Sequence, residues 1–330
     1  MRGTAAAVWL VRRLAAAVAI VFGVVTLTFV VIHLAPGSPF LPGPDRPVDP
    51  RVIAALVHRW GLDQPITTQY LRYLRGLLHG DFGFAFSQGI TVAQALAAAI
   101  PNTLLLAATA LVLDLGGGLF IGLLQAARAR RTTDVALGNA TLFIYSVPTF
   151  WLGLVLVFVF SIWLRWLPPT GTTTPGAYES LSFLGRIGDR LLHLILPACT
   201  LGLVGAAGTA RFQRAALLET LGRDFIRTAR AKGLAERRVL LVHALRNALL
   251  PFITLVGVSL PFLLTGSVLI EDVFSWPGMG RLATDAVLAR DHSLVTAVAI
   301  VASTLVVTGS LVADLLYAVA DPRIRAREAS

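Results

Sequence analysis

Long apolar segments constrain this chain more than any other feature. A helix that spans a bilayer needs about 20 consecutive, mostly apolar residues. Segments of this kind occur at residues 14–34, 103–127, 135–164, 191–210, 249–270 and 294–319. Of the 330 residues, 56% are hydrophobic and only 14% are charged, whereas soluble domains carry about 25% charged residues. We therefore predict an all-α, polytopic membrane protein with six transmembrane helices.

Basic residues are distributed unevenly between the two sides that six helices define. The side that carries both termini has 18 Lys and Arg against 6 Asp and Glu, whereas the other side has 10 of each. Because loops on the cytoplasmic side of a membrane are enriched in Lys and Arg, both termini are predicted to lie in the cytoplasm. Topology thus explains the net charge of +10, and no nucleic-acid partner is expected.

The predicted orientation divides the chain into four parts. These are an N-terminal tail with the first transmembrane helix (1–34), an extracytoplasmic segment with short helices (35–102), a membrane core of five helices (103–319) with a cytoplasmic loop at 211–250, and a cytoplasmic tail (320–330). Helical spacing within the extracytoplasmic segment predicts short helices at 51–60 and 69–79. Arg2, Arg12 and Arg13 before the first apolar segment also suit a cleaved signal peptide. That segment exceeds the roughly 7–15 residues of a signal-peptide core, which favours a retained anchor.

Residues that carry catalytic or metal chemistry are sparse. The single cysteine, Cys199, lies in an apolar segment, which excludes a cluster of thiolate ligands. The single lysine, Lys232, is followed by Gly233, so the sequence contains no G-x-x-x-x-G-K-[ST] nucleotide loop. The 6 histidines are scattered and lack the spacing of metal ligands. We therefore expect no catalytic residue, no metal site and no cofactor in this chain, which is predicted not to be an enzyme.

The loop at residues 211–250 is the most informative polar part of the chain. Asp224 is predicted to cap a short helix over residues 225–232, which Gly233 ends in a left-handed conformation. A second helix is predicted to begin near Glu236. This pattern indicates a helix–glycine–helix elbow that protrudes from the membrane.

The first helix of this elbow (residues 224–238) is predicted to be amphipathic. Phe225, Ile226 and Ala229 share one face at about 100° per residue, and its arginines lie on the other side. The elbow is small enough to fit a groove in a partner protein. Alternatively, the loop is a basic juxtamembrane segment that only fixes orientation and contacts anionic lipid.

The sequence around the elbow resembles the EAA loop of ABC-importer permeases. The stretch RTARAKGL (227–234), which continues to HALRNALLP (243–251), is similar to the variant found in the dipeptide, oligopeptide and nickel permease family. Supporting motifs along the chain are LAPGSP (34–39), GLDQP (61–65), GDFG (80–83), PNTL (101–104), PTFW (148–151), EDVFSWPGMG (271–280) and DPRIR (321–325). The N-terminal pattern resembles the first, or B-type, permease of a heterodimeric pair. Arg227 replaces the glutamate of the general signature, and Ser293 and Ser310 replace the usual proline and asparagine.

The resemblance implies a type I ABC-importer permease in the bacterial inner membrane, with peptides as cargo. Its implied partners are a second homologous permease, two cytoplasmic ABC ATPases that bind ATP and Mg, an extracytoplasmic substrate-binding protein and the lipid bilayer. The elbow would transmit movement of the ATPases to the transmembrane helices. The implied coupling residues are Asp224, Phe225, Arg227, Thr228, Ala229, Arg230, Ala231, Lys232, Gly233, Leu234, Arg237 and Arg238.

Two further sets of residues are candidates for function. Asp114 and Asp314 are ionisable residues within predicted spans, where such residues are often functional. Asp114 either lines the path of the cargo or forms a buried hydrogen bond with a neighbouring helix, and a structural role is favoured for Asp314. The second set follows the fifth predicted span and either docks the binding protein or forms a structural turn. It comprises Glu271, Trp276, Pro277 and Gly278.

Other functions remain open from the residues alone. An ion-coupled secondary transporter would use intramembrane acids such as Asp114 and internal inverted repeats, and no such repeat is visible. A membrane-embedded enzyme would need a convergent set of catalytic residues, which is also not visible. Within the importer family, nickel or another solute is the alternative cargo.

Overall fold

The computed structural model describes residues 2–34, 51, 58, 63–249, 252 and 268–320, with the backbone alone at 2–10, 32–33 and 313–320. These residues are mostly helical. The helices are α1 (Arg2–Leu34), α3 (Ile66–Leu78), α4 (Val92–Ala127), α5 (Thr132–Ser146), α6 (Thr149–Val157), α7 (Phe183–Leu221), α8 (Asp224–Ala231), α9 (Glu236–Arg238), α11 (Val268–Val273), α12 (Met279–Leu288) and α13 (His292–Ala320). A π-helical turn follows α6 (Phe158–Trp163) and another follows α9 (Val239–Ala244), and a 3-10 turn covers Tyr178–Ser180. The short strands β1 (Phe84–Ala85) and β2 (Ile90–Thr91) pair antiparallel.

Four helices are long and apolar enough to cross a membrane: α1, α4, α7 and α13. The α5–α6 pair is a fifth candidate, either as a broken span or as a re-entrant loop. The predicted fifth span, 249–270, falls largely outside the described residues, as does the predicted helix at 51–60. The structure therefore contains four or five candidate spans within its described part.

Helix α4 begins at Val92, before the apolar segment predicted to start at residue 103. The helix starts at Val92, where Thr91 accepts a hydrogen bond from the backbone N–H of Gln94 and the Gln94 side chain caps Thr91 in return. This reciprocal arrangement satisfies two free N–H groups at a helix start. Pro101 lies inside the helix, so it removes one backbone hydrogen bond without ending the helix.

The span predicted at 135–164 is not one unbroken helix. Helices α5 and α6 meet at a bend of 103°. Val147 adopts an extended conformation before Pro148, because the proline ring disfavours helical geometry in the preceding residue. Pro148 is the residue from which this break could have been predicted.

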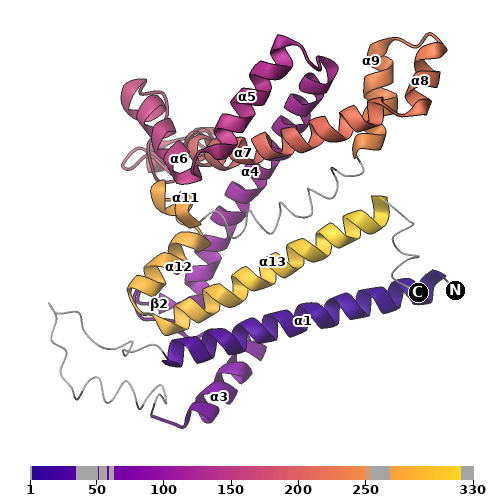
Figure 1. Cartoon of the computed structure of the whole chain (residues 1–330). Helices are drawn as coiled ribbons and strands as arrows, with labels where there is room; N and C mark the ends of the chain where they lie inside the picture. The colour runs from indigo at the N-terminus through magenta and orange to yellow at the C-terminus, as the bar shows by residue number, and fades with distance from the viewer. Residues whose placement is uncertain are drawn as a thin grey trace.

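The long helices pack in two pairs (Figure 1). Helices α1 and α13 run antiparallel and side by side, while α4 packs against α7. Close contact in the second pair requires glycine: a Cβ at Gly118 would lie 2.5 Å from the Cβ of Thr209, and one at Gly122 would lie 2.8 Å from the carbonyl oxygen of Ala210. Small residues allow such close approach of helices in lipid.

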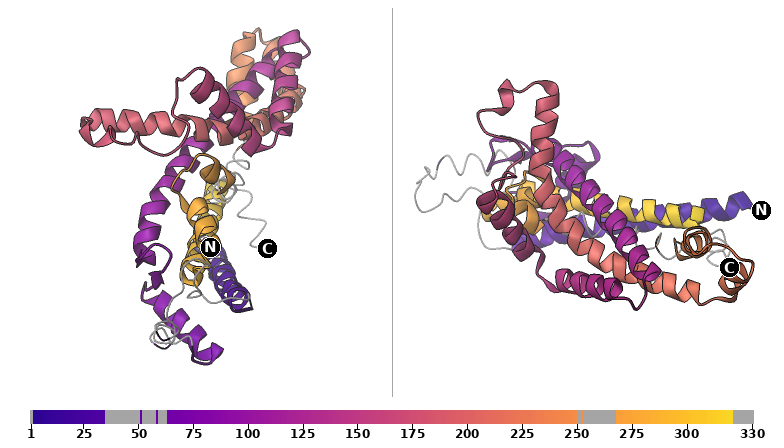
Figure 2. Two further views of the ribbon diagram at one scale, coloured as in Figure 1. Left: turned by 90° about the vertical axis from the view of Figure 1, so that its left-hand side faces the viewer. Right: turned by 90° about the horizontal axis from the view of Figure 1, so that it is seen from above.

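Different elements of the chain lie at the two ends of the molecule (Figure 1). The start of α1, the end of α13, the α4–α5 turn and the α8–α9 elbow lie toward one end, and α3, the β-ribbon and α12 lie toward the other. The first turns of α7 extend away from the other helices in both views of Figure 2. This extension carries exposed apolar side chains, including Phe183 and Leu184.

Helix α3 confirms the helix predicted near residues 69–79, with a start at Ile66. It packs on α1: the rings of Tyr70 and Tyr73 lie 5.1 and 5.8 Å from that of Phe29. The hydroxyl groups of Thr26 and Tyr70 are 2.6 Å apart. Helix α3 is therefore held at the end of α1 that lies away from the elbow.

Candidate functional site

The elbow has the predicted helix–glycine–helix form. Helix α8 ends at Ala231, Gly233 has a φ of +76°, and α9 begins at Glu236. A left-handed residue of this kind is common directly after a helix, and glycine adopts it without steric cost. Asp224 is the first residue of α8 rather than its cap, and its carboxylate accepts a hydrogen bond from Arg227 at 3.3 Å.

The elbow folds back on the ends of the long helices. Ile226 is fully buried and Ala229 is 7% exposed. They belong to an apolar cluster with Leu217 at the end of α7, Ala126 at the end of α4 and residues of the π-helical turn after α9. Phe225, predicted to share a face with these two residues, is 40% exposed. The buried face is centred between Ile226 and Ala229, which leaves Phe225 at its edge.

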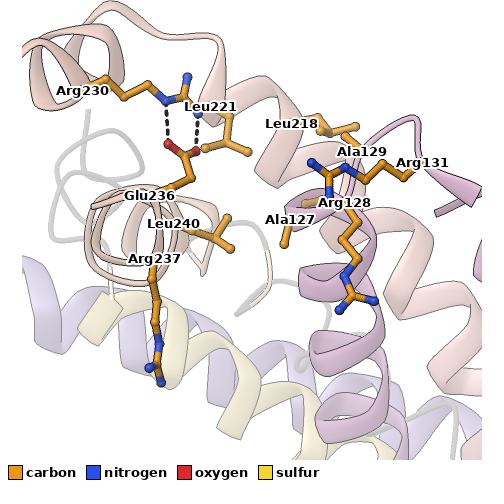
Figure 3. Close-up of a pocket in the computed structure, with 11 residues that line it drawn as sticks. Ala127, Arg128, Ala129, Arg131, Leu218, Leu221, Arg230, Glu236, Arg237 and Leu240 are labelled. Atoms are coloured by element: carbon orange, nitrogen blue, oxygen red, sulfur yellow. Dashed lines mark hydrogen bonds and ion pairs between the residues drawn. The ribbon is translucent and has the colours of Figure 1, made fainter. Parts of the chain in front are cut away.

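An ion pair closes the open end of the elbow (Figure 3). The Arg230 guanidinium donates two hydrogen bonds to the Glu236 carboxylate, at 2.6 and 3.1 Å. The hydrogen bonds from Arg230 hold the pKa of Glu236 below its ordinary value of 4.5, and the carboxylate raises the pKa of Arg230. Both side chains are partly exposed, so the pair restrains geometry more than it adds stability.

Most of the residues predicted to couple the elbow to a partner are exposed. Ala229 is the buried exception, and Leu234 is half-buried. Ala229 therefore contacts the chain itself, which leaves it outside the surface open to a partner. The exposed members are Asp224, Phe225, Arg227, Thr228, Arg230, Ala231, Lys232, Gly233, Arg237 and Arg238. Together they form a mainly basic surface.

A partly buried ion pair connects the α4–α5 turn to α7 just before the elbow. The Asp134 carboxylate, 4% exposed, accepts two hydrogen bonds from the Arg214 guanidinium, at 2.7 and 2.8 Å. It also accepts one from the backbone N–H of Arg130 at 2.8 Å. Bidentate geometry of this kind fixes orientation as well as position. This pair was not predicted from the sequence, although Asp134 is a rare acid on the basic side of the chain.

The residues predicted to dock a binding protein are mostly internal. Glu271 is fully buried and Trp276 is 1% exposed. The Glu271 carboxylate accepts hydrogen bonds from Thr103 at 2.8 Å and from the N–H groups of Gly280 and Arg281 at 2.6 and 3.1 Å. These contacts hold the α11–α12 hairpin (residues 268–288) on α4.

The tip of this hairpin makes two further contacts with α4. The Trp276 indole donates to the carbonyl oxygen of Asn102 at 3.0 Å, and the Asn102 side chain donates to the carbonyl of Pro277 at 2.9 Å. Gly278 is buried as well, so Pro277 is the exposed residue of the four candidates. The geometry favours the structural-turn alternative for Glu271 and Trp276.

Asp114 is buried between α4 and α7. It is 4% exposed, and one carboxylate oxygen accepts a hydrogen bond from Thr209 at 2.6 Å. A Cβ at Gly205 would lie 2.6 Å from the carboxyl carbon of Asp114, so this glycine makes room for the acid. This environment favours the buried-hydrogen-bond alternative. The side chain of Asp314 lies outside the described residues.

Within the described part of the chain, no group of three or more His, Cys, Asp and Glu side chains is arranged to hold a metal ion. The structure brings polar residues together at four places: the elbow, the Asp134–Arg214 pair, the α11–α12 hairpin and the buried Asp114. All four hold helices against one another.

Comparison with known proteins identifies the family. The family described as "binding-protein-dependent transport system inner membrane component" matches residues 118–326, and its N-terminal counterpart matches residues 7–107. An oligopeptide transport system permease protein, AppB, of Bacillus subtilis (strain 168) is 39% identical over 96% of this chain and 99% of its own. A di/tripeptide transport system permease protein, DppB, of Pseudomonas aeruginosa (strain UCBPP-PA14) is 39% identical over 96% and 98%. A glutathione transport system permease protein, GsiC, of Escherichia coli (strain K12) is 37% identical over 96% and 98%.

These matches confirm the resemblance drawn from the motifs. They cover both halves of the chain, including the elbow and the α11–α12 hairpin. Such components are non-catalytic membrane permeases, so the chain is not an enzyme, and its candidate spans belong to a multi-pass protein of the bacterial inner membrane. The chain belongs to the family of inner membrane components of binding-protein-dependent transport systems.

Proposed function

We propose that this chain is one of two permease subunits of an ATP-driven importer of peptides, and that the elbow receives the mechanical input. The single observation that carries the proposal is the form of the elbow. One face packs into the ends of α4 and α7, while the other presents exposed basic side chains. A rigid projection of this kind can pass a displacement to both long helices.

The proposed orientation places both termini and the elbow in the cytoplasm, with six spans in all. Its support is the excess of Lys and Arg on that side of the sequence. The position of the elbow at the same end as the start of α1 and the end of α13 is consistent with it. In this arrangement residues 35–102 are extracytoplasmic, 103–319 form the membrane core, and 320–330 are a cytoplasmic tail.

The proposed partners are those of a binding-protein-dependent system. A second homologous permease completes the passage, two ABC ATPases bind ATP and Mg, and an extracytoplasmic binding protein delivers the cargo. The exposed coupling residues would lie in a groove of one ATPase, where Arg227 and Lys232 meet acidic groups. The packed face, including Ala229, would carry the motion into α4 and α7.

Peptides are the proposed cargo because the similar permeases named above serve oligopeptide, di/tripeptide and glutathione transport systems. Nickel remains the alternative cargo within the family. Pro277 is the remaining candidate for direct contact with the binding protein, since it is exposed at the tip of the α11–α12 hairpin.

The test replaces Gly233 with valine and compares it with two controls. A β-branched residue is strained by about 1–3 kcal/mol at φ near +76°, whereas asparagine tolerates that conformation. Gly222, at φ −80° in the same loop, is the matched site where valine meets no such restriction. The assay is ATP-dependent uptake of a labelled tripeptide by the complete complex in proteoliposomes, with the ATPase rate and the amount of inserted protein measured in parallel.

Uptake is expected to fall strongly in Gly233→Val and to persist in Gly233→Asn and Gly222→Val, with normal insertion in all three. ATP hydrolysis that continues without uptake in Gly233→Val would identify the defect as one of coupling. Normal peptide uptake by Gly233→Val would contradict the proposed role of the elbow.

A further inference from the structure

Helix α3 carries an apolar face that is wider than the surface of α1 against which it packs. Tyr70 and Tyr73 meet α1, where both rings lie near that of Phe29. At about 100° per residue, Leu71 and Leu78 fall on the flank of this face, beside the side that contacts α1. Their exposed fractions are 66% and 86%. Contacts among the described residues therefore leave this apolar flank of α3 largely uncovered.

The opposite side of α3 is polar. Thr68, Arg72 and Arg75 lie there, and all three are exposed. A helix with leucines along one face and arginines on the other is typical of helices that lie at a membrane interface. The apolar face of such a helix enters the boundary between headgroups and acyl chains, while its basic side chains remain among the headgroups.

The contact with α1 places α3 at a depth that suits this role. The candidate span of α1 runs from Val11 to Val31, and its contacts with α3 include Thr26 and Phe29. At a rise of about 1.5 Å per residue, Phe29 and Thr26 lie about 3 and 8 Å inside the end of this span. An interfacial helix buries its apolar face by about 5–10 Å. Helix α3 is therefore held where the hydrocarbon region begins.

The polar contact between the two helices needs no water. The Thr26 hydroxyl donates to the carbonyl oxygen of Phe22 at 2.8 Å, so its oxygen can accept a hydrogen bond from the Tyr70 hydroxyl at 2.6 Å. Such pairing avoids the cost of bringing an unpaired hydroxyl group into an apolar environment. Tyrosine is also enriched at membrane interfaces, because its ring is apolar and its hydroxyl is polar. Tyr70 thus suits the boundary of the membrane.

The part of α1 beside α3 is itself suited to lipid. Leu27, Val30 and Val31 lie on the turns of α1 that contact α3, and all three side chains are exposed. A span that is apolar all round suits lipid on each side that no other helix covers. The uncovered flank of α3 therefore lies next to a surface that lipid can cover.

We propose that α3 lies at the extracytoplasmic interface of the membrane, with Leu71 and Leu78 among the acyl chains of the lipid. Arg72 and Arg75 then face the phosphate headgroups. The choice of leaflet rests on the proposed orientation of the chain, in which α3 lies at the end opposite the elbow (Figure 1). Through its contact with α1, a helix anchored in this way resists displacement of that span along the membrane normal.

The test measures the surroundings of single nitroxide labels in the complete complex, reconstituted in proteoliposomes without the binding protein. Leu71→Cys and Leu78→Cys carry the label on the apolar flank, and Thr68→Cys on the polar side of the same helix is the matched control. All are made in a Cys199→Ala background with partner subunits that lack reactive cysteines. Since the three labelled positions are exposed, the labels leave the contact with α1 intact. Electron paramagnetic resonance gives the collision rates of each label with oxygen, which concentrates among acyl chains, and with a water-soluble nickel chelate.

The ratio of oxygen to nickel-chelate collisions should be several-fold higher for Leu71→Cys and Leu78→Cys than for Thr68→Cys. Equal ratios at the three positions would overturn the proposal. Labels on the flank that neither reagent reaches would reveal another subunit there and would overturn it as well. So would labels that the nickel chelate reaches until the binding protein is added, which would assign the flank to that protein. Peptide uptake by the same proteoliposomes tests the proposed function separately, so normal uptake with equal collision ratios would refute this inference alone.

Discussion

The hydroxyl group of Thr103 donates a hydrogen bond of 2.8 Å to the carboxylate of Glu271, although 168 positions separate the two residues. The same hydroxyl oxygen accepts a hydrogen bond from the backbone N–H of Met279 at 2.7 Å. Thr103 is thus hydrogen-bonded to both helices of the α11–α12 hairpin, to Glu271 in α11 and to Met279 in α12. Because Glu271 is fully buried, its hydrogen bonds replace the water that it loses on folding, and leaving one unmade is costly.

Replacement of Thr103 by valine is expected to destabilise the protein by about 1–3 kcal/mol, because valine keeps the shape but removes one hydrogen bond to the buried Glu271 carboxylate and the acceptor of the Met279 N–H. Thermal unfolding followed by tryptophan fluorescence measures the loss. Thr109→Val is the control, since the Thr109 hydroxyl bonds only to Leu105 in its own helix. A similar change in both variants would show that the bond to Glu271 contributes nothing specific.

Alanine at position 278 is expected to displace the hairpin. A Cβ there would lie 2.5 Å from both the carboxyl carbon of Glu271 and the hydroxyl oxygen of Thr103, which is too close for non-bonded atoms. The loss in free energy of unfolding should exceed that of Thr103→Val, and peptide uptake should fall as well. Gly116→Ala is the control, because a Cβ at that position in α4 meets nothing within 4 Å. An unfolding temperature unchanged in Gly278→Ala would contradict the closeness of this packing.

Asparagine at position 114 is expected to preserve both folding and uptake. Its side-chain oxygen can still accept the hydrogen bond from Thr209, and the amide is uncharged, which lowers the cost of burial. Leucine should destabilise the α4–α7 pair, because the buried Thr209 hydroxyl would lose this acceptor. Loss of peptide uptake in Asp114→Asn, with normal stability, would instead indicate that the negative charge acts on the cargo.

Acidification is expected to open the elbow. The pKa of Glu236 is lowered in the folded protein from 4.5 by its bonds to Arg230, so the open form binds the proton more tightly. The Arg230–Glu236 ion pair therefore restrains the elbow fully above pH 4.5. This restraint is lost as the pH falls through the lowered pKa of Glu236. Spin labels at Thr228→Cys and Arg238→Cys, in a Cys199→Ala background, report the distance across the turn.

Their distance distribution should be narrow at pH 7 and broad at pH 3. In Glu236→Gln it should already be broad at pH 7 and should change little with pH. A narrow distribution in that variant at neutral pH would show that the Gly233 turn alone sets the shape of the elbow.

The sequence by itself determined the membrane character, the helical class and the elbow. Segments such as 14–34 can satisfy their backbone in lipid only as helices, and Gly233 combines a helix end with a residue that enters left-handed space freely. These properties are local, so the sequence pattern was sufficient. The family motifs extended this to the permease class because their order and spacing run along nearly the whole chain.

The tertiary structure alone decided which polar residues face inward. From the sequence, Glu271 and Trp276 suited either a docking site or a structural turn. Contacts with the distant residues Thr103 and Asn102 bury them. The Asp134–Arg214 pair likewise brings together residues from separate helices. Hydrogen bonding and charge neutralisation act over a few ångströms in space, and only the packing of α4 against α7 and the hairpin brings these groups within that distance.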